Sequence, residues 1–180
     1  MLDSDLQKIS YKVYACYDAN DFGKAKRILK EALEKNPDEY WLISNLAICH
    51  YETGKFKLAL ELSYQAYAIA PYDPMVLNYH ASILKVNDFF KEAIDAWLKI
   101  LNTPEEELAN SRFGEGLKWA KSLKVDTLFN IGNAYYLIDD FKTAVKYYQE
   151  HLNNRKRGLY SLFSKAEVQA ELDDALWRMS

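Results

Sequence analysis

The 180-residue chain carries 23 basic and 26 acidic residues, and its net charge of −3 gives no reason to expect a nucleic acid or an anionic membrane as partner. No apolar run approaches the roughly 18–20 residues of a membrane span, and the start lacks the apolar core of a signal peptide. With two cysteines and no spaced cysteine framework, a reduced cytoplasmic protein is the simplest expectation.

Apolar residues at helical spacing, with only four prolines and six glycines, predict an all-α chain built from helix pairs. The first pair spans 5–38, and Asp21 is the expected N-cap of its second helix. The second pair spans 39–72 and turns at Gly54. The third spans 73–103 and begins at Asp73-Pro74, an N-cap followed by proline at the first helical position.

The pattern breaks after the third pair, where residues 104–123 form an insertion. We expect a short helix or loop there, and then a lengthened helix that runs from about 112 or 115 to 138. A fourth pair spans 124–153, and a basic connector occupies 154–158. The last predicted helix, 164–179, begins with the capping box Ser164/Glu167 and carries one apolar stripe, which suits the closing helix of a stacked array.

The helix pairs repeat. Phenylalanine recurs at the evenly spaced positions 22, 56 and 90, and again at position 141, which is one and a half intervals later. Alanine follows three positions after each of them, at 25, 59, 93 and 144, and Pro37 and Pro71 are separated by the same interval. The fourth pair reads Leu128-x2-Ile131-Gly132-x2-Tyr135 and then Ala144-x3-Tyr148, which resembles the tetratricopeptide repeat, whose helix pairs recur at this same interval.

This resemblance implies a single domain, a right-handed superhelical array of antiparallel helix pairs with about four units and a C-terminal capping helix. In this family the first helix of each pair lines a concave groove that binds a peptide or a helix of another protein. The positions that match the groove here are Ser10, Tyr14, Tyr17, Trp41, Ser44, Ile48, Tyr51, Met75, Asn78, Ser82, Lys85, Phe129, Asn133 and Tyr136.

The aromatic members of this set are typical of protein interfaces, but they also suit packing between neighbouring units. Tyr17 and Tyr51 fit either interpretation. The groove is favoured for Tyr14, Trp41 and Phe129, because their helical faces point away from the repeated Phe/Ala stripe.

One specialisation within the family is a clamp of lysine and asparagine side chains that holds a C-terminal carboxylate. Only Asn45 matches that clamp, so we expect an apolar or amphipathic segment in the groove. A secondary site is expected in the insertion, at Phe113 and Trp119, since insertions in repeat arrays often lie on a binding face. The alternative is that Trp119 only packs on the lengthened helix.

Catalytic chemistry has little support in the sequence. No nucleotide-binding, hydrolase or metalloprotease motif is present, and His50, His80 and His151 occupy repeat positions that normally lie in the core. We therefore predict a non-enzymatic adaptor that binds a protein segment, without cofactor, metal, nucleic acid or membrane, and homo-oligomerisation stays open. A secretion-type chaperone that holds an apolar segment is the alternative, and a nucleic-acid binder or an enzyme comes third.

Overall fold

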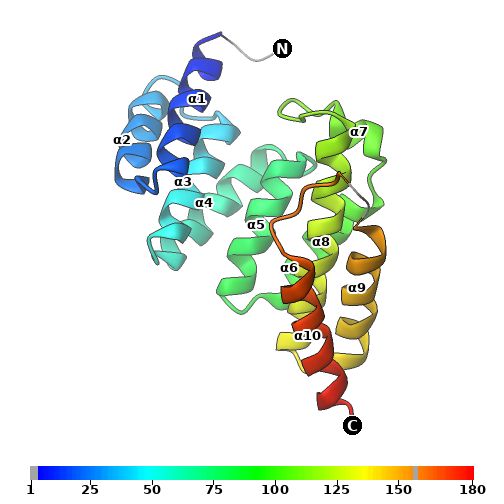
Figure 1. Ribbon diagram of the computed structural model, residues 1–180. Helices are drawn as coiled ribbons and strands as arrows, with labels where there is room; N and C mark the ends of the chain where they lie inside the picture. The colour runs from blue at the N-terminus through cyan, green and yellow to red at the C-terminus, as the bar shows by residue number, and fades with distance from the viewer. Residues whose placement is uncertain (1–3, 156–157) are drawn as a thin grey trace. The chain divides into compact units, whose positions relative to one another are not determined.

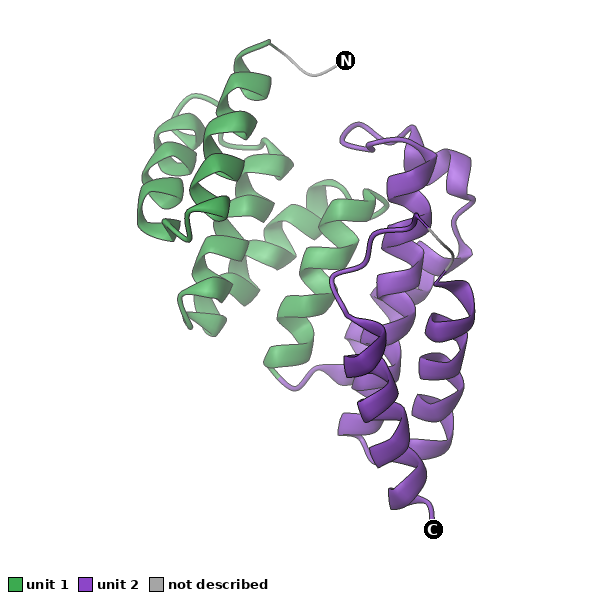
Figure 2. Ribbon diagram, in the orientation of Figure 1, with its two compact units in different colours: residues 1–87 green, residues 88–180 purple. Residues whose placement is uncertain are grey.

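The computed structural model describes residues 4–155 and 158–180, and these residues form helices and no strand (Figure 1). The chain divides into two compact units, residues 1–87 and residues 88–180 (Figure 2). Unit 1 contains α1 (Ser4–Asp18), α2 (Phe22–Leu33), α3 (Tyr40–Glu52), α4 (Phe56–Ile69) and α5 (Pro74–Val86). Unit 2 contains α6 (Phe90–Asn102), α7 (Glu105–Ala109), α8 (Leu117–Leu137), α9 (Phe141–Asn154) and α10 (Lys165–Arg178).

The predicted all-α array of helix pairs is confirmed. The insertion forms the short helix α7 and the first turns of a lengthened α8, and α10 begins at the predicted capping box of Ser164 and Glu167. The division into units lies between α5 and α6, so it falls inside the predicted third repeat. The insertion helix α7 belongs to unit 2. Residues 1–3 and the Lys156–Arg157 part of the basic connector lie outside the described residues. None of the helices that the structure describes is long and apolar enough to cross a membrane.

The turn within each helix pair has the same backbone geometry. Asn20, Gly54, Asp88 and Asp139 have φ angles of 53°, 70°, 67° and 62°, and they repeat at the spacing of the phenylalanines. Glycine, asparagine and aspartate adopt this left-handed region at the lowest cost, and a residue in that conformation ends a helix. The following helix then starts at an aspartate N-cap in two of these turns: Asp21 accepts the Lys24 N–H and Asp140 accepts the Thr143 N–H.

Small residues let the two helices of a pair approach closely. The repeated alanines at 25, 59, 93 and 144 are all completely buried. In unit 2 the close approach of two helices requires glycine at position 132, because a Cβ on Gly132 would lie 2.8 Å from Cδ1 and Cε1 of Tyr148. The Tyr148 side chain is itself completely buried, so its ring has no room to move aside.

Gly132→Ala is therefore expected to destabilise the protein, although alanine is the better helix former by about 1 kcal/mol. Overpacking typically costs about 1–3 kcal/mol, so after the gain in helix propensity we expect a net loss of up to about 2 kcal/mol in the free energy of unfolding. Gly23→Ala is the matched control, because a Cβ at Gly23 would meet only Asp21 Oδ1, at 3.5 Å, and this change should stabilise the protein. Urea denaturation that shows the same shift for both variants would contradict the packing argument.

Candidate functional site

The first helices of unit 1 present a row of partly buried aromatic, aliphatic and polar side chains. We call this row the first-helix face; its members are Tyr14 and Tyr17 on α1, Ile48 and Tyr51 on α3, and Met75, Asn78, Ser82 and Lys85 on α5. Corresponding members occupy equivalent repeat positions, for example Tyr14, Ile48 and Ser82 at intervals of one repeat. Helix α3 packs directly against α5, so these two parts of the face are contiguous.

Tyr17 connects α1 to α3. Its hydroxyl group lies 3.0 Å from the carbonyl oxygen of Asn45, to which it donates, and 3.1 Å from Asn45 Oδ1, while the Cys49 thiol donates to the same hydroxyl at 3.6 Å. The Asn45 amide donates to the carbonyl of Trp41 at 2.8 Å, which orients the amide oxygen toward the tyrosine. Burial raises the pKa of Tyr17, so the phenol remains a neutral donor. Sequence reasoning missed this structural use of Asn45, whose signal was an amide side chain on a largely apolar helix.

The structure places Trp41 and Ser44 in the core, with 2% and 4% of their surfaces exposed. The expectation that Trp41 lines an open groove is therefore wrong. Helix α3 is packed against α2, α4 and α5, so the side of the helix that points away from the Phe/Ala stripe also meets protein. The Trp41 ring makes an edge-on contact with Tyr14, with ring centroids 6.0 Å apart, and this contact supports the partly exposed tyrosine.

The rest of the first-helix face keeps accessible surface. Tyr51 and Ile48 pack against a buried cluster of Ala47, Ala59 and Ile83, and each leaves part of its side chain exposed. Burial raises the pKa of Tyr51 and lowers that of Lys85, as expected for groups that are only partly hydrated. Ser82 donates to the carbonyl of Asn78 at 2.9 Å, and the Met75 N–H is held by the N-cap Asp73. The face therefore offers both apolar and polar surface that is accessible to solvent.

In unit 2 the corresponding residues of α8 are covered by the chain itself. Residues 158–164 run as an extended stretch of chain along α8, and α10 then packs beside α9 (Figure 1). We call residues 158–178 the C-terminal segment. The ring centroid of Phe163 lies 4.0 Å from that of Phe129, and Tyr136 donates its hydroxyl to Asp174. Asn133 lies between them on α8 and is partly exposed.

Phe129 is thus not an open groove residue, contrary to the sequence-based expectation. Only 9% of its surface is exposed, and its ring lies between Tyr148, His151 and Phe163, with centroid distances of 5.6, 6.0 and 4.0 Å. The reason is that the C-terminal segment places Phe163 against Phe129 and packs α10 against α9. Helical periodicity in the sequence shows which residues share a face of α8, but it does not show that the C-terminal segment covers that face.

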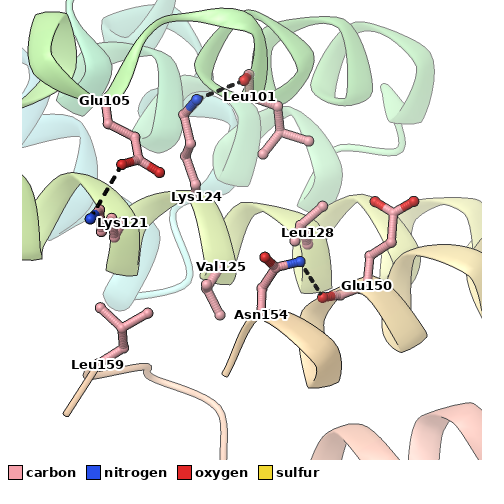
Figure 3. Close-up of a pocket in the computed structure, with 9 residues that line it drawn as sticks. All are labelled: Leu101, Glu105, Lys121, Lys124, Val125, Leu128, Glu150, Asn154 and Leu159. Carbon is pink, nitrogen blue, oxygen red and sulfur yellow. Dashed lines mark hydrogen bonds and ion pairs between the residues drawn. The ribbon is translucent and has the colours of Figure 1, made fainter. Parts of the chain in front are cut away.

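The secondary site residues Phe113 and Trp119 are both partly buried, and the guanidinium carbon of Arg112 lies 5.1 Å from the Phe113 ring centroid. Near the insertion, but without these two residues in its lining, a pocket of about 730 Å³ lies among α6, α7, α8, α9 and the stretch of chain at Leu159 (Figure 3). Its cationic groups have partners within the chain: Lys121 pairs with Glu105 at 3.7 Å, and Lys124 donates to the carbonyl of Leu101 at 2.9 Å. We therefore do not place the site there.

The three histidines are buried, which confirms their expected core positions. His80 Nδ1 lies 2.9 Å from Ser63 Oγ, and His151 Nδ1 lies 2.8 Å from the carbonyl oxygen of Val125. His50 differs, because its buried Nδ1 has no hydrogen-bond partner among the residues that the structure describes. Within residues 4–155 and 158–180, no group of three or more His, Cys, Asp or Glu side chains is placed to hold a metal ion.

His151 makes the stability of the protein depend on pH. Its Nδ1 carries the proton, because the Val125 carbonyl only accepts, and burial together with the nearby Arg155 lowers the pKa of the ring. The unfolded chain therefore takes up a proton first as the pH falls below about 6.5, and the free energy of unfolding decreases by up to about 1.4 kcal/mol per pH unit until the folded pKa is reached.

The measurement is urea denaturation at pH 7.5 and pH 5.5 for wild type and His151→Asn, whose amide can still donate to Val125 but does not titrate. We expect a smaller loss of stability at pH 5.5 in the variant. Burial also lowers the pKa of His50, and this contribution is common to the two proteins. Burial raises the pKa of Asp126, which favours the folded state as the pH falls, and the charge of His151 opposes that rise, so the substitution acts on Asp126 in the same direction as the loss of the titrating ring. Equal losses in both would rule out His151 as the source.

The helix pairs and their turns define the fold class of this protein. It has the tetratricopeptide-repeat fold, which is a scaffold for protein–protein interaction and generally a non-enzymatic module. Residues 17–63, from the end of α1 through the middle of α4, match the family model described as tetratricopeptide repeat. The resemblance drawn from the sequence is thereby confirmed.

Solved structures with this fold are similar over nearly the whole chain. BtubC (BKLC) from P. vanneervenii is 19% identical with a TM-score of 0.73, and the match covers 97% of this chain and 72% of that one. Pseudomonas aeruginosa pilF is 18% identical with a TM-score of 0.73, covering 96% and 68%. The MamA MSR-1 C2 structure is 16% identical with a TM-score of 0.68, covering 98% and 88%. No curated protein sequence matches the chain.

Proposed function

We propose that this protein is a non-enzymatic adaptor that binds a peptide or an amphipathic helix of a partner protein on the first-helix face of unit 1. The observation that carries the proposal is the row of partly exposed side chains around Tyr14, Ile48 and Tyr51 on consecutive first helices. Tyrosine rings supply a large contact area together with a polar hydroxyl and lose little conformational freedom on binding, which makes them frequent interface hot spots.

The chemistry of the face supports an apolar or amphipathic ligand. Ile48 and Tyr51 are backed by the packed cluster of Ala47, Ala59 and Ile83, so the binding surface is rigid before the ligand arrives. Neighbouring Asn78 and Ser82 supply polar groups at the edge of the apolar area. A surface of this kind matches the helix-in-groove or extended-peptide modes of recognition.

The test is affinity capture from native lysate with substitutions that alter the face and matched substitutions that do not. Ser82→Arg places a bulky charge on the face, and Gln65→Arg places the same charge on an exposed position of α4. Tyr51→Ala removes a ring from the face, and Tyr72→Ala removes one that is 81% exposed in the turn before α5.

We expect a partner that binds wild type, Gln65→Arg and Tyr72→Ala and that binds Ser82→Arg and Tyr51→Ala at least about 10-fold more weakly, since loss of a hot-spot side chain costs about 1–2 kcal/mol or more. Circular dichroism of each variant verifies that it is folded. A partner that binds all five proteins equally would move the site away from the first-helix face.

A further inference from the structure

The C-terminal segment contacts unit 2 in the way a bound ligand contacts a receptor. It has an extended part with one aromatic anchor, Phe163, whose ring lies against Phe129 of α8. A helix follows, capped at its start by Ser164, and its buried residues Val168, Leu172 and Ala175 pack on α9 at helical spacing. These are the two elements of peptide recognition by grooves, an anchor and an amphipathic helix.

The receptor side supplies polar contacts to the main chain of the segment. Asp126 Oδ2 accepts the N–H of Leu162 at 3.2 Å, and Arg155 at the end of α9 donates to the carbonyl of Phe163. Main-chain contacts of this type hold an extended peptide whatever its neighbouring side chains are. Further along, Tyr136 donates to Asp174, and Arg178 of the segment lies over the Tyr136 ring at 5.7 Å.

The fit of the segment is incomplete in two places. Asp126 is about nine-tenths buried, and among the described residues its Oδ1 atom has no hydrogen-bond partner. The Ser161 hydroxyl of the segment lies close enough to lower the pKa of this carboxyl, but it donates to the carbonyl of Phe163 at 3.1 Å. The extended part also leaves Tyr160 and Leu162 about two-thirds exposed, at 67% and 69%. A buried carboxylate oxygen without a partner is unfavourable, so a different segment with a donor at this place would satisfy the receptor better.

We propose that the surface formed by α8 and α9 is a second protein-binding site, filled in cis by the C-terminal segment, which a partner segment of the same pattern displaces. The partner carries an aromatic residue just before an N-capped amphipathic helix, and it places a hydrogen-bond donor opposite Asp126. Because the cis segment is tethered, its effective concentration is in the millimolar range. It reduces the apparent affinity of any partner in proportion to the fraction of molecules whose site is open. This site is independent of the first-helix face of unit 1.

The test uses the full chain and a fluorescent peptide of residues 158–180, which has the required pattern. Leu172→Ala in the chain weakens the cis contact by truncating a buried side chain, while Leu176→Ala truncates one that is 44% exposed on the same helix. We expect the wild-type peptide to bind the Leu172→Ala chain about 30-fold or more tightly than it binds wild type or Leu176→Ala, because the site is open for a larger fraction of the time.

Fluorescence anisotropy measures the affinity, and a peptide that itself carries Leu172→Ala should lose the gain. A folded Leu172→Ala chain that binds the wild-type peptide no better than wild type does would overturn the proposal and make the C-terminal segment a fixed part of the core. Light scattering that shows the wild-type chain dimerising in a concentration-dependent way, with the added peptide dissociating the dimer, would overturn it in favour of a second copy as the occupant. Neither result would affect the capture experiment that tests partner binding on the first-helix face of unit 1.

Discussion

A chain that ends after Gly158 is expected to lose several kcal/mol of stability and to aggregate. Helix α10 contributes Val168, Leu172 and Ala175 to a buried cluster with Phe129 and Tyr148, and their exposures are 0%, 6% and 0%. Burial of a valine or leucine side chain is worth about 1.5–3 kcal/mol, so the three residues together contribute on the order of 5 kcal/mol. Their removal also uncovers the aromatic rings of unit 2, and a contiguous apolar patch promotes association.

Thermal unfolding and size-exclusion chromatography measure the two consequences. Point substitutions separate the burial of α10 from the loss of chain: Leu172→Ala should cost about 2–4 kcal/mol, whereas Leu176→Ala, whose side chain is 44% exposed, should cost less than about 1 kcal/mol. A monomeric truncated protein with an unchanged midpoint of unfolding would show that α10 is not part of the core of unit 2.

Trp41→Ala is the second change with a large expected effect. Trp41 is 2% exposed, packs on Tyr14 and lies beside the Tyr17–Asn45–Cys49 hydrogen bonds that join α1 to α3. Truncation of a buried tryptophan leaves a large cavity and typically costs about 3–5 kcal/mol. Since small domains have a total stability of about 5–15 kcal/mol, unit 1 should unfold at markedly lower urea concentration or temperature.

Trp177→Ala is the matched control, because Trp177 is 70% exposed on α10. We expect it to change the free energy of unfolding by less than about 0.5 kcal/mol. Helicity followed by circular dichroism is the suitable measurement, since both substitutions remove a fluorophore. If Trp41→Ala unfolds like Trp177→Ala, the α1–α3 interface does not depend on the indole ring. Because Trp41→Ala is expected to destabilise unit 1 strongly, loss of partner binding in that variant would not identify a groove residue.

Several features of the fold follow from short-range properties and were predictable. The helix starts at Asp21, Asp73 and Ser164 depend on side chains that accept backbone N–H groups within three residues. The turns at Gly54 and Asp139 depend on which residues adopt a positive φ at low cost. The regular recurrence of phenylalanine and alanine shows that the same local solution is used again, and hence that the chain is an array of helix pairs.

The candidate site was predictable only in part. Helical periodicity placed Tyr14 and Ile48 at one pair of equivalent positions on α1 and α3, and Tyr17 and Tyr51 at another, and all four are partly exposed. It did not reveal that Tyr17 forms hydrogen bonds with Asn45, because that contact joins residues 28 positions apart. The groove positions themselves, as a binding surface, remain a prediction that the capture experiment tests.

The sequence by itself thus determined the fold class, the helix pairs, their caps and the closing helix, because each depends on interactions within a few residues or on their periodic recurrence. Only the tertiary structure decided which faces stay open. Trp41 and Phe129 occupy repeat positions that suit an exposed groove, but Trp41 lies on a helix packed against α2, α4 and α5, and Phe129 lies beneath Phe163. Periodicity shows which residues share a side of a helix, whereas burial depends on what segments far along the chain bring against that side.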